Sequence, residues 1–324
     1  MRAIVCQGSG GPEVLAWGEA PDPACGRDEL LLRVHATSVN RADLLQRRGL
    51  YPPPPGASPL LGLEAAGTVL EVGAGVAGVR RGDRVMALLP GGGYAEKVAV
   101  DAGWTAPLPP RVGLPAAGGL VEVFLTAFLN LVELGQVRPG ERVLVHGGAG
   151  GVGTAAIQLA RARGAEVWTT AGDAARLARC AELGATGLVD HRQEDFVARL
   201  KAAGGADLIL DLMGAAYLER NLEALAPDGR LLVIGLQGGT RGELPLLALL
   251  QKRARLQGST LRGLPGPRKT ALMARFKDEV LPLFQAGALR VVVDRVLPLA
   301  EAAAAHRALE ASPGPVGKVI LAVP

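Results

Sequence analysis

The chain is poor in cysteine and in aromatic residues: 3 of its 324 residues are cysteine, and Phe, Trp and Tyr together make up 3%. Three scattered cysteines supply neither a disulfide framework nor a cysteine-based metal cluster, which favours a reducing compartment. Apolar runs stay below the roughly 18 residues that a membrane-spanning helix needs, and the first residues lack the pattern of a signal peptide. We therefore expect a cytoplasmic protein with no membrane partner.

Long blocks of like charge are also missing. The net charge is +4, and charged residues make up 20% of the chain. Because nucleic-acid binding normally requires a basic stripe or patch, we expect no nucleic-acid partner. Hydrophobic residues reach 49%, and a chain of this length can form two domains that each bury a core.

Glycine, by contrast, is abundant, and one glycine cluster is informative. An apolar stretch is followed by Gly148-Ala149-Gly150-Gly151-Val152-Gly153, and a helical segment with apolar residues on one face comes next. In this pattern the first glycine permits the tight turn, the second lets the backbone approach a pyrophosphate, and the third allows close helix–strand packing. The helix N-terminus adds free N–H groups. We interpret the segment as a dinucleotide-binding turn; the alternative is an ordinary glycine-rich turn.

From residue 142 to about residue 261 the pattern alternates between short apolar strands and helical segments. Six strands joined by helical crossovers predict an α/β domain with a doubly wound parallel sheet. We assign this domain to residues 123–263. The predicted strands are 142–146, 167–170, 187–189, 207–212, 230–235 and 256–261, and the predicted helices include 174–183, 193–203 and 217–225.

The first 120 residues contain short β-like runs separated by glycine and proline, which predicts an irregular, mainly antiparallel domain. After residue 264 the pattern does not extend the parallel sheet, so we assign that segment to the first domain, which then comprises 1–122 and 264–324. The predicted strands are 2–7, 29–36, 67–72, 84–89, 94–100, 291–296 and 317–323, and the predicted helices are 41–48, 271–284 and 300–309.

Several motifs spread over the whole chain point to one family. They include Asn40-Arg-Ala-Asp43, Tyr51-Pro-Pro-Pro-Pro-Gly56, Gly62-Leu-Glu64, Leu125-Thr-Ala-Phe128 and Gly151-Val-Gly-Thr-Ala-Ala-Ile-Gln-Leu159. Together they resemble the medium-chain dehydrogenase/reductase superfamily, in particular its zinc-free, zeta-crystallin-like quinone oxidoreductases of the p53-inducible type. The resemblance implies a GroES-like β domain, a Rossmann domain, a cofactor in the cleft between them and a homodimer.

The residues at the zinc positions argue against a metal. Zinc-dependent members of this superfamily carry Cys where Asn40 stands and His where Leu63 stands. Catalytic zinc generally needs three protein ligands of the Cys, His or carboxylate kind, and Glu64 alone cannot hold it. Without a Lewis acid the acceptor must take a hydride readily, as quinones and conjugated carbonyl compounds do.

Two residues are the candidate catalytic groups. The resemblance places Asn40 near the nicotinamide ribose or the substrate carbonyl, and the alternative is that Asn40 only caps the following helix. Tyr51 precedes four prolines that stiffen its loop. Its phenol, protonated at neutral pH, is a candidate hydrogen-bond donor to the quinone oxygen; the alternative is that Tyr51 only packs against the loop.

Cofactor choice depends on the ends of two predicted strands. Asp173, after Gly172, lies 20 residues beyond the last glycine, where an acidic group would hold the adenosine ribose of NAD. Arg176 and Arg192 suit the 2′-phosphate of NADPH, and His191 could stack on the adenine. Asp173 could instead pair with an arginine or cap a helix. We favour NADPH and keep NADH as the alternative.

The remaining candidate cofactor contacts are less specific. Thr126 and Lys318 match family positions near the pocket; the alternatives are a helix-interior threonine bonded to its own backbone and an exposed charge. The others follow predicted strands at their C-terminal ends, the edge at which such sheets bind ligands, although each could be a simple turn residue: Gly214, Gly235, Leu236 and Leu261.

The sequence therefore predicts an NADPH-dependent quinone oxidoreductase without zinc. An enone or enoyl-thioester reductase is the alternative within enzymes, because it uses the same cofactor geometry. A protein that binds NADPH without catalysis, as a crystallin or a nucleotide sensor, is the alternative from another class.

Overall fold

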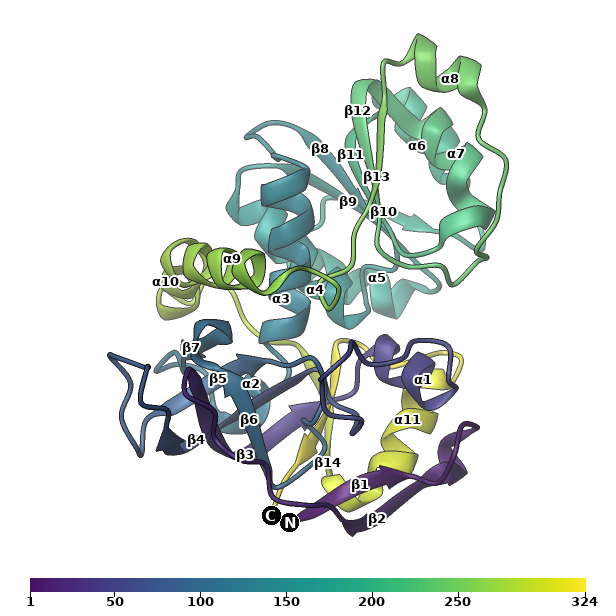
Figure 1. Ribbon diagram of the computed structural model, residues 1–324. Coiled ribbons are helices and arrows are strands. Elements are labelled where there is room, and N and C mark those ends of the chain that lie inside the picture. Colours follow the sequence, from purple (N-terminus) through teal and green to yellow (C-terminus); the bar gives the residue numbers. More distant parts are fainter. The chain divides into compact units, whose positions relative to one another are not determined.

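The computed structural model describes residues 1–324, which form two compact units (Figure 1). Unit 1 comprises Met1–Leu125 and Arg262–Pro324, and unit 2 comprises Thr126–Leu261. The predicted domain boundaries, after residues 122 and 263, lie a few residues from these limits. None of the helices combines the length and apolarity that a membrane crossing demands.

Unit 1 is built on a seven-stranded sheet in the order β14-β15-β3-β4-β5-β7, with β6 also paired to β3. Every pair is antiparallel except β14–β15, as the mainly antiparallel prediction requires. A separate hairpin joins β1 (Arg2–Cys6) and β2 (Leu15–Glu19), of which β2 was not predicted. The sheet strands are β3 (Glu29–Ser38), β4 (Glu64–Val72), β5 (Arg84–Leu88), β6 (Lys97–Asp101), β7 (Thr105–Pro107), β14 (Val293–Pro298) and β15 (Lys318–Ala322).

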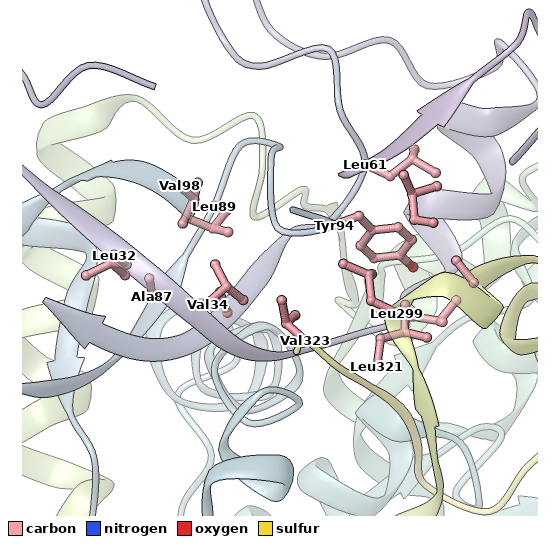
Figure 2. Packing of buried hydrophobic residues seen from close by; sticks show 14 of the residues in the cluster. Leu32, Val34, Leu61, Ala87, Leu89, Tyr94, Val98, Leu299, Leu321 and Val323 are labelled. Atoms are coloured by element: carbon pink, nitrogen blue, oxygen red, sulfur yellow. The ribbon is translucent and has the colours of Figure 1, made fainter. Parts of the chain in front are cut away.

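The core of unit 1 follows the two-residue period of its strands. Leu30, Leu32 and Val34 alternate along β3 and are fully buried, and each such side chain contributes about 1.5–3 kcal/mol. Figure 2 shows Leu32 and Val34 in the same core as Tyr94. A strand beginning at Tyr94 was wrong: β6 begins at Lys97, and the Tyr94 hydroxyl lies 3.0 Å from His306 Nε2 inside the core.

The helices of unit 1 correct one prediction. A single helix over 271–284 was wrong, because α9 (Gly266–Glu279) starts earlier and α10 (Leu281–Gln285) follows a break. Pro282 has no N–H to continue the first helix, and its ring disfavours helical backbone just before it. The other helical segments are η1 (Pro12–Val14), α1 (Arg41–Arg47), η2 (Ala102–Trp104), α2 (Leu114–Ala117), α3 (Val121–Phe128, continuing into unit 2), η5 (Leu299–Glu301) and α11 (Ala302–Glu310).

Unit 2 is the predicted doubly wound sheet of six parallel strands, which confirms the Rossmann prediction. The strand order is β10-β9-β8-β11-β12-β13 (Figure 1). The order reverses between β8 and β11, the position where open α/β sheets bind ligands. The strands are β8 (Arg142–Val145), β9 (Glu166–Ala171), β10 (Gly187–Asp190), β11 (Ala206–Asp211), β12 (Leu225–Val233) and β13 (Arg255–Gly258).

The helices of unit 2 end largely where the glycines predicted. Gly164, Gly184 and Gly204 have φ of +79°, +109° and +95°, the left-handed backbone that ends a helix. The helical segments are η3 (a π-helix, Leu129–Leu134), α4 (Gly151–Ala162), α5 (Ala174–Glu182), α6 (Phe196–Ala202), η4 (Gly214–Tyr217), α7 (Leu218–Ala224) and α8 (Leu246–Gln251).

Two element boundaries predicted in unit 2 were wrong, and α4 is more buried than predicted. The expected apolar face of α4 is buried at Ala155, Ala156, Leu159 and Ala160, but the buried run covers all of 153–160, so this part of the helix is covered on all sides. The strand expected over 256–261 ends at Gly258. The helix expected from 193 begins at Phe196, because the Asp195 carboxylate caps it by accepting the Val197 N–H.

Candidate functional sites

The glycine turn of unit 2 joins β8 to α4. Gly147 has φ of +62°, so it supplies the left-handed turn residue; assigning that role to Gly148 was wrong. A Cβ on Gly148 would instead collide with Thr169 Oγ1 of the neighbouring strand. On Gly153 it would meet the Gly147 carbonyl and, at 2.6 Å, the Gly148 Cα, so the third glycine does allow close helix–strand packing.

The surroundings of Gly150 differ from those of Gly148 and Gly153. The nearest atom to a Cβ built there is the Gly147 carbonyl oxygen at 3.4 Å, so this face of the turn is open. Gly150 is also the N-cap of the 12-residue α4, whose first N–H groups, at Gly151 and Val152, have no acceptor within the helix. An open glycine and a free helix N-terminus fit a pyrophosphate group.

A buried hydrogen-bond chain supports the turn. The Gly147 N–H donates to Thr170 Oγ1 (3.2 Å), and the Thr170 hydroxyl lies 3.1 Å from His146 Nδ1. His146 Nε2 lies 2.7 Å from Asn221 Oδ1, so the ring nitrogen donates to this amide oxygen. Burial lowers the pKa of His146 to about 4, which keeps the ring neutral. The sequence analysis missed this chain because His146 and Asn221 are 75 residues apart.

The structure brings five candidate residues together at the ends of β9 and β10. A Cβ on Gly172 would lie 3.3 Å from both His191 Nε2 and Arg192 Nε, so these side chains converge over that glycine. Asp173 Oδ1 accepts the Arg176 N–H (2.8 Å), and its Oδ2 accepts Arg176 Nε (3.0 Å). Both alternatives for Asp173, helix cap and arginine partner, are therefore realised, and these contacts lower its pKa.

The other candidate cofactor residues lie on other segments of the chain. Gly214 has φ of +74°, and its N–H donates to Asp211 Oδ2 (3.0 Å). Thr126 is half-buried, and its carbonyl accepts from Asn130 Nδ2 (2.9 Å). Gly235 follows β12 and Leu236 is exposed, whereas Leu261 is buried. Contact of these residues with a cofactor stays a prediction.

In unit 1 a buried polar cluster surrounds Asn40. The Asn40 amide oxygen accepts from Lys318 Nζ (2.6 Å), and the amide nitrogen donates to Glu64 Oε1 (3.0 Å). Asn40 also stands at the N-cap of α1, where its backbone N–H donates to Asp43 Oδ2 (2.8 Å). Since Glu64 takes one amide N–H, the other remains for a ligand.

Lys318 is not an exposed charge: its residue is 3% exposed, so that alternative was wrong. Besides Asn40, its ammonium contacts the Val39 carbonyl (3.4 Å) and Glu64 Oε1 (3.1 Å). These three acceptors match its three N–H donors. Lys318 therefore fixes the orientation of the Asn40 amide. This role could not be inferred from the sequence, because the two residues are 278 positions apart.

Tyr51 is held by a residue that the sequence analysis missed. The Arg262 guanidinium lies 5.3 Å from the centre of the Tyr51 ring. Arg262 is buried, and it donates to the Pro90 carbonyl (2.8 Å) and to Gln46 Oε1 (2.8 Å). Burial raises the pKa of Tyr51, so its phenol is protonated at neutral pH.

Glu122 is a second residue that sequence reasoning missed. Its backbone N–H donates to Glu64 Oε2 (3.0 Å), so two glutamates meet in this cluster. Burial and the neighbouring Glu64 carboxylate raise the pKa of Glu122 to about 8. A half-buried acid next to a second glutamate is a signal that only the folded structure provides.

Comparison with known proteins identifies the family. An alcohol dehydrogenase GroES-like domain model matches residues 26–110, and a zinc-binding dehydrogenase model matches residues 151–278. Quinone oxidoreductase of Rattus norvegicus is 32% identical over 99% of this chain and 97% of its own length. The chain belongs to the medium-chain dehydrogenase/reductase superfamily. It is thus related to oxidoreductases along its whole length.

Other proteins similar to this chain are named for different functions. A synaptic vesicle membrane protein VAT-1 homolog of Rattus norvegicus is 32% identical over 99% of this chain and 84% of its own length. The Escherichia coli quinone oxidoreductase complexed with NADPH has a TM-score of 0.88 at 30% identity, covering 99% of this chain and 100% of that one. An NAD-dependent alcohol dehydrogenase has a TM-score of 0.89 at 34% identity, covering 100% of each chain. The CurK enoyl reductase has a TM-score of 0.86 at 27% identity, covering 100% of this chain and 99% of that one.

Within this superfamily the two candidate sites fall in different matched regions. Asn40 and Glu64 lie in the GroES-like match, and the start of α4 opens the dehydrogenase match. Membership of the superfamily thus explains why the chain has both kinds of site, but it does not identify the substrate that accepts the hydride.

Proposed function

We propose that the chain is an NADPH-dependent reductase of quinones or similar conjugated carbonyl compounds that works without zinc. The observation that carries this proposal is the Lys318 ammonium, 2.6 Å from Asn40 Oδ1 and 3.1 Å from Glu64 Oε1. A site that presents a fixed cation and an amide donor can bind and polarise a carbonyl oxygen. Its residues are poorly suited to hold the Lewis acid that an unactivated alcohol or ketone normally requires.

The absence of zinc is supported by chemistry of the residues present. Asn40 and the buried, apolar Leu63 are poor metal ligands. Glu64 could serve as one ligand, but its Oε1 already accepts from Ser38, Asn40 and Lys318. A divalent ion here would have to displace a buried ammonium, so the donor set does not fit zinc.

The cofactor proposal rests on the turn and on the cations of unit 2. Gly150 and the N-terminus of α4 would hold the pyrophosphate, and Arg176 and Arg192 would meet the 2′-phosphate. The NADPH complex of the related Escherichia coli quinone oxidoreductase supports this choice. Asp173 does not oppose it strongly, because Arg176 already neutralises that carboxylate. When bound, NADPH supplies the hydride.

Asn40 and Tyr51 would then bind the acceptor. The free Asn40 N–H donates to a ligand oxygen without turning, since Lys318 and Glu64 fix the amide. The Tyr51 phenol supplies a second donor, held by Arg262 and by the prolines that follow it. Such preorganised donors stabilise negative charge that develops on the acceptor oxygen.

The test is a panel of reduced-cofactor oxidation assays with NADPH and NADH against a quinone, an unsaturated ketone, an enoyl thioester and a saturated ketone. We expect turnover of NADPH with the quinone or the unsaturated ketone and none with the saturated ketone. Turnover confined to the enoyl thioester would favour an enoyl reductase instead. NADPH binding with no turnover on any acceptor would favour a non-catalytic nucleotide-binding protein.

We also propose that the chain forms a homodimer through the edge of the unit 2 sheet. Strand β13 pairs only with β12, and all four of its residues are exposed. Unpaired edges of this kind are templates for pairing with a second copy. Exposed leucines nearby in the sequence add apolar surface: Leu246, Leu247, Leu250 and Leu256.

Light scattering after size-exclusion chromatography tests the homodimer. It should give the dimer mass for wild type, and Leu256→Lys should shift that mass towards the monomer.

A further inference from the structure

One buried basic side chain of the protein has no hydrogen-bond acceptor. The buried basic residues are Arg47, Arg230, Arg262, Lys269 and Lys318. All of them except Lys269 donate to a carbonyl, carboxylate or amide oxygen. Lys269 is only 6% exposed, yet its ammonium forms neither a hydrogen bond nor an ion pair with the chain. A buried ammonium is normally paired, because taking an unpaired charge out of water costs free energy.

Lys269 also stands where the helix pattern calls for an apolar residue. The buried residues of α9 are Lys269, Leu272, Met273 and Phe276, spaced i, i+3, i+4 and i+7 along one face. Burial lowers the pKa of Lys269, and Glu122 opposes this shift only in part. A leucine or methionine would fill this position without burying a charge. The lysine therefore points to a role other than packing.

The Lys269 ammonium lies over the ring of Trp104 in η2, 4.7 Å from the ring centre. This cation–π contact holds the ammonium in place, but its N–H groups still have no oxygen acceptor. Trp104 has an unpaired donor of its own, because its indole Nε1 is buried and has no hydrogen-bond partner. Buried polar groups are nearly always paired. Two neighbouring unpaired donors on different elements therefore indicate that both donate to a ligand.

The same ring lies against the N-terminus of the 14-residue α9. A Cβ built on Gly266, the first residue of the helix, would lie 3.6 Å from Trp104 Cζ2. The N-cap residue, Pro265, has no side chain that accepts a hydrogen bond, and the first turn contains no acidic residue. The N–H groups of Gly266 and Arg268 therefore have no acceptor within the helix. The positive end of the helix and the Lys269 ammonium together favour negative charge at this place.

We propose that Lys269, Trp104 and the N-terminus of α9 form a binding site for an oxyanion, the carboxylate or phosphate group of a small ligand. The ammonium supplies the charge, and the indole N–H and the first N–H groups of the helix supply oriented donors. None of these residues belongs to the glycine turn or to the cluster around Asn40. The inference therefore goes beyond the proposed function and does not depend on it.

The first test observes the Trp104 indole N–H directly. The chain has three tryptophans, so a nitrogen–proton NMR spectrum contains three indole signals, and Trp104→Phe identifies the signal of Trp104. The protein is titrated with inorganic phosphate and with acetate, and sodium chloride at equal ionic strength is the reference. We expect a saturable shift of the Trp104 signal with one or both oxyanions, and the comparison tells a phosphate site from a carboxylate site. An equal shift with chloride, or no shift with either oxyanion, would overturn the proposal.

The second test compares two lysines of the same helix. Lys269→Met should weaken binding of the active oxyanion about tenfold, because it removes a charge-assisted hydrogen bond. Lys277→Met is the control, since Lys277 is only half-buried on α9, and it should bind as wild type does. Equal affinities of Lys269→Met and wild type would exclude Lys269 from the site.

Urea unfolding separates a ligand-binding lysine from a structural one. Lys269→Met removes an unpaired buried charge, so its midpoint without added oxyanion should equal or exceed that of wild type. The active oxyanion should then raise the midpoint of wild type more than that of Lys269→Met, because only wild type keeps the complete site. A midpoint of Lys269→Met that falls as far as that of Lys318→Met would show that the lysine stabilises the fold, and the inference would be wrong.

Discussion

The two candidate sites are built in different ways. The nucleotide turn of unit 2 uses backbone and glycine: Gly148 and Gly153 allow close packing, and Gly150 leaves one face open. The cluster of unit 1 uses charge: the Lys318 ammonium and the Glu64 carboxylate hold the Asn40 amide, and the Glu122 backbone N–H donates to the same carboxylate. The first site presents a shape for a phosphate group, and the second presents oriented hydrogen-bond donors.

Because of this difference, different substitutions disrupt the two sites. The glycine turn is disrupted when a substitution adds a side-chain atom, because that atom clashes with its neighbours. A charge cluster is lost when one partner is removed, because the remaining charge stays buried without compensation. The predictions below exploit this contrast, beginning with the largest expected effect.

Lys318→Met should destabilise the protein most. It leaves the buried Glu64 carboxylate without its cation, which costs about 3–5 kcal/mol. Urea unfolding at neutral pH measures the change. Lys97→Met, which removes an exposed ion pair with Asp22, is the control and should leave the midpoint nearly unchanged. Adding Glu64→Gln to Lys318→Met should recover stability; a further loss would contradict the ion-pair account.

His146 makes unit 2 sensitive to acid. Its pKa falls from 6.5 in the unfolded chain to about 4 in the fold, so unfolding takes up a proton between these values and stability is lost as pH falls through them. The buried ring accounts for a loss of about 2–3 kcal/mol between pH 6.5 and pH 4.5. His146→Gln should make the decline of the urea midpoint shallower. An equally steep decline in the variant would show that a group other than His146 takes up the proton on unfolding.

Two glycines of the turn form a matched pair. Gly153→Ala places a Cβ against backbone atoms and should cost about 1–3 kcal/mol in unfolding free energy and abolish NADPH binding. Gly150→Ala meets only ordinary contacts, so its stability should stay within about 0.5 kcal/mol of wild type. Its affinity for NADPH should still fall about tenfold, because the new methyl occupies the open face. Calorimetric titration with unchanged affinity for Gly150→Ala would refute a phosphate at that face.

Asp173→Ser should have the smallest effect. Serine keeps the helix cap and releases Arg176 from its carboxylate partner. The affinity for NADPH should rise about two- to fivefold, since an exposed ion pair contributes little, and the affinity for NADH should stay the same or fall. Titrations with both nucleotides check this, and a preference that moves towards NADH would contradict the roles given to Arg176 and Arg192.

The same contrast explains what the sequence could predict. The turn, the parallel strands and the glycine helix ends of unit 2 are local patterns, and the fold class followed from them. The sequence assigned the turn role to Gly148, whereas the reason for a glycine there is its close contact with Thr169. Thr169 lies on another strand, so this contact could not be inferred from the sequence. Asn40 and Tyr51 were named as candidates, but the residues that orient them, Lys318 and Arg262, lie more than 200 residues away.

Glu122 shows the limit most clearly. In the sequence it is one acidic residue in a mostly apolar segment, and nothing marks it as functional. Its raised pKa arises only when folding places it next to Glu64. Chemistry that depends on two charges meeting requires the structure.

Steady-state kinetics at varied NADPH concentration, for wild type, Gly150→Ala and Tyr51→Phe with one quinone, tests most directly whether the two sites have separate roles. Gly150→Ala should raise the KM for NADPH about tenfold and leave kcat unchanged, because it removes binding that is uniform along the reaction. Tyr51→Phe removes a donor to the acceptor oxygen, so it should lower kcat about 10²-fold and leave this KM unchanged. If both variants change kcat and KM in parallel, the division between a nucleotide-holding turn and an acceptor-binding cluster is wrong.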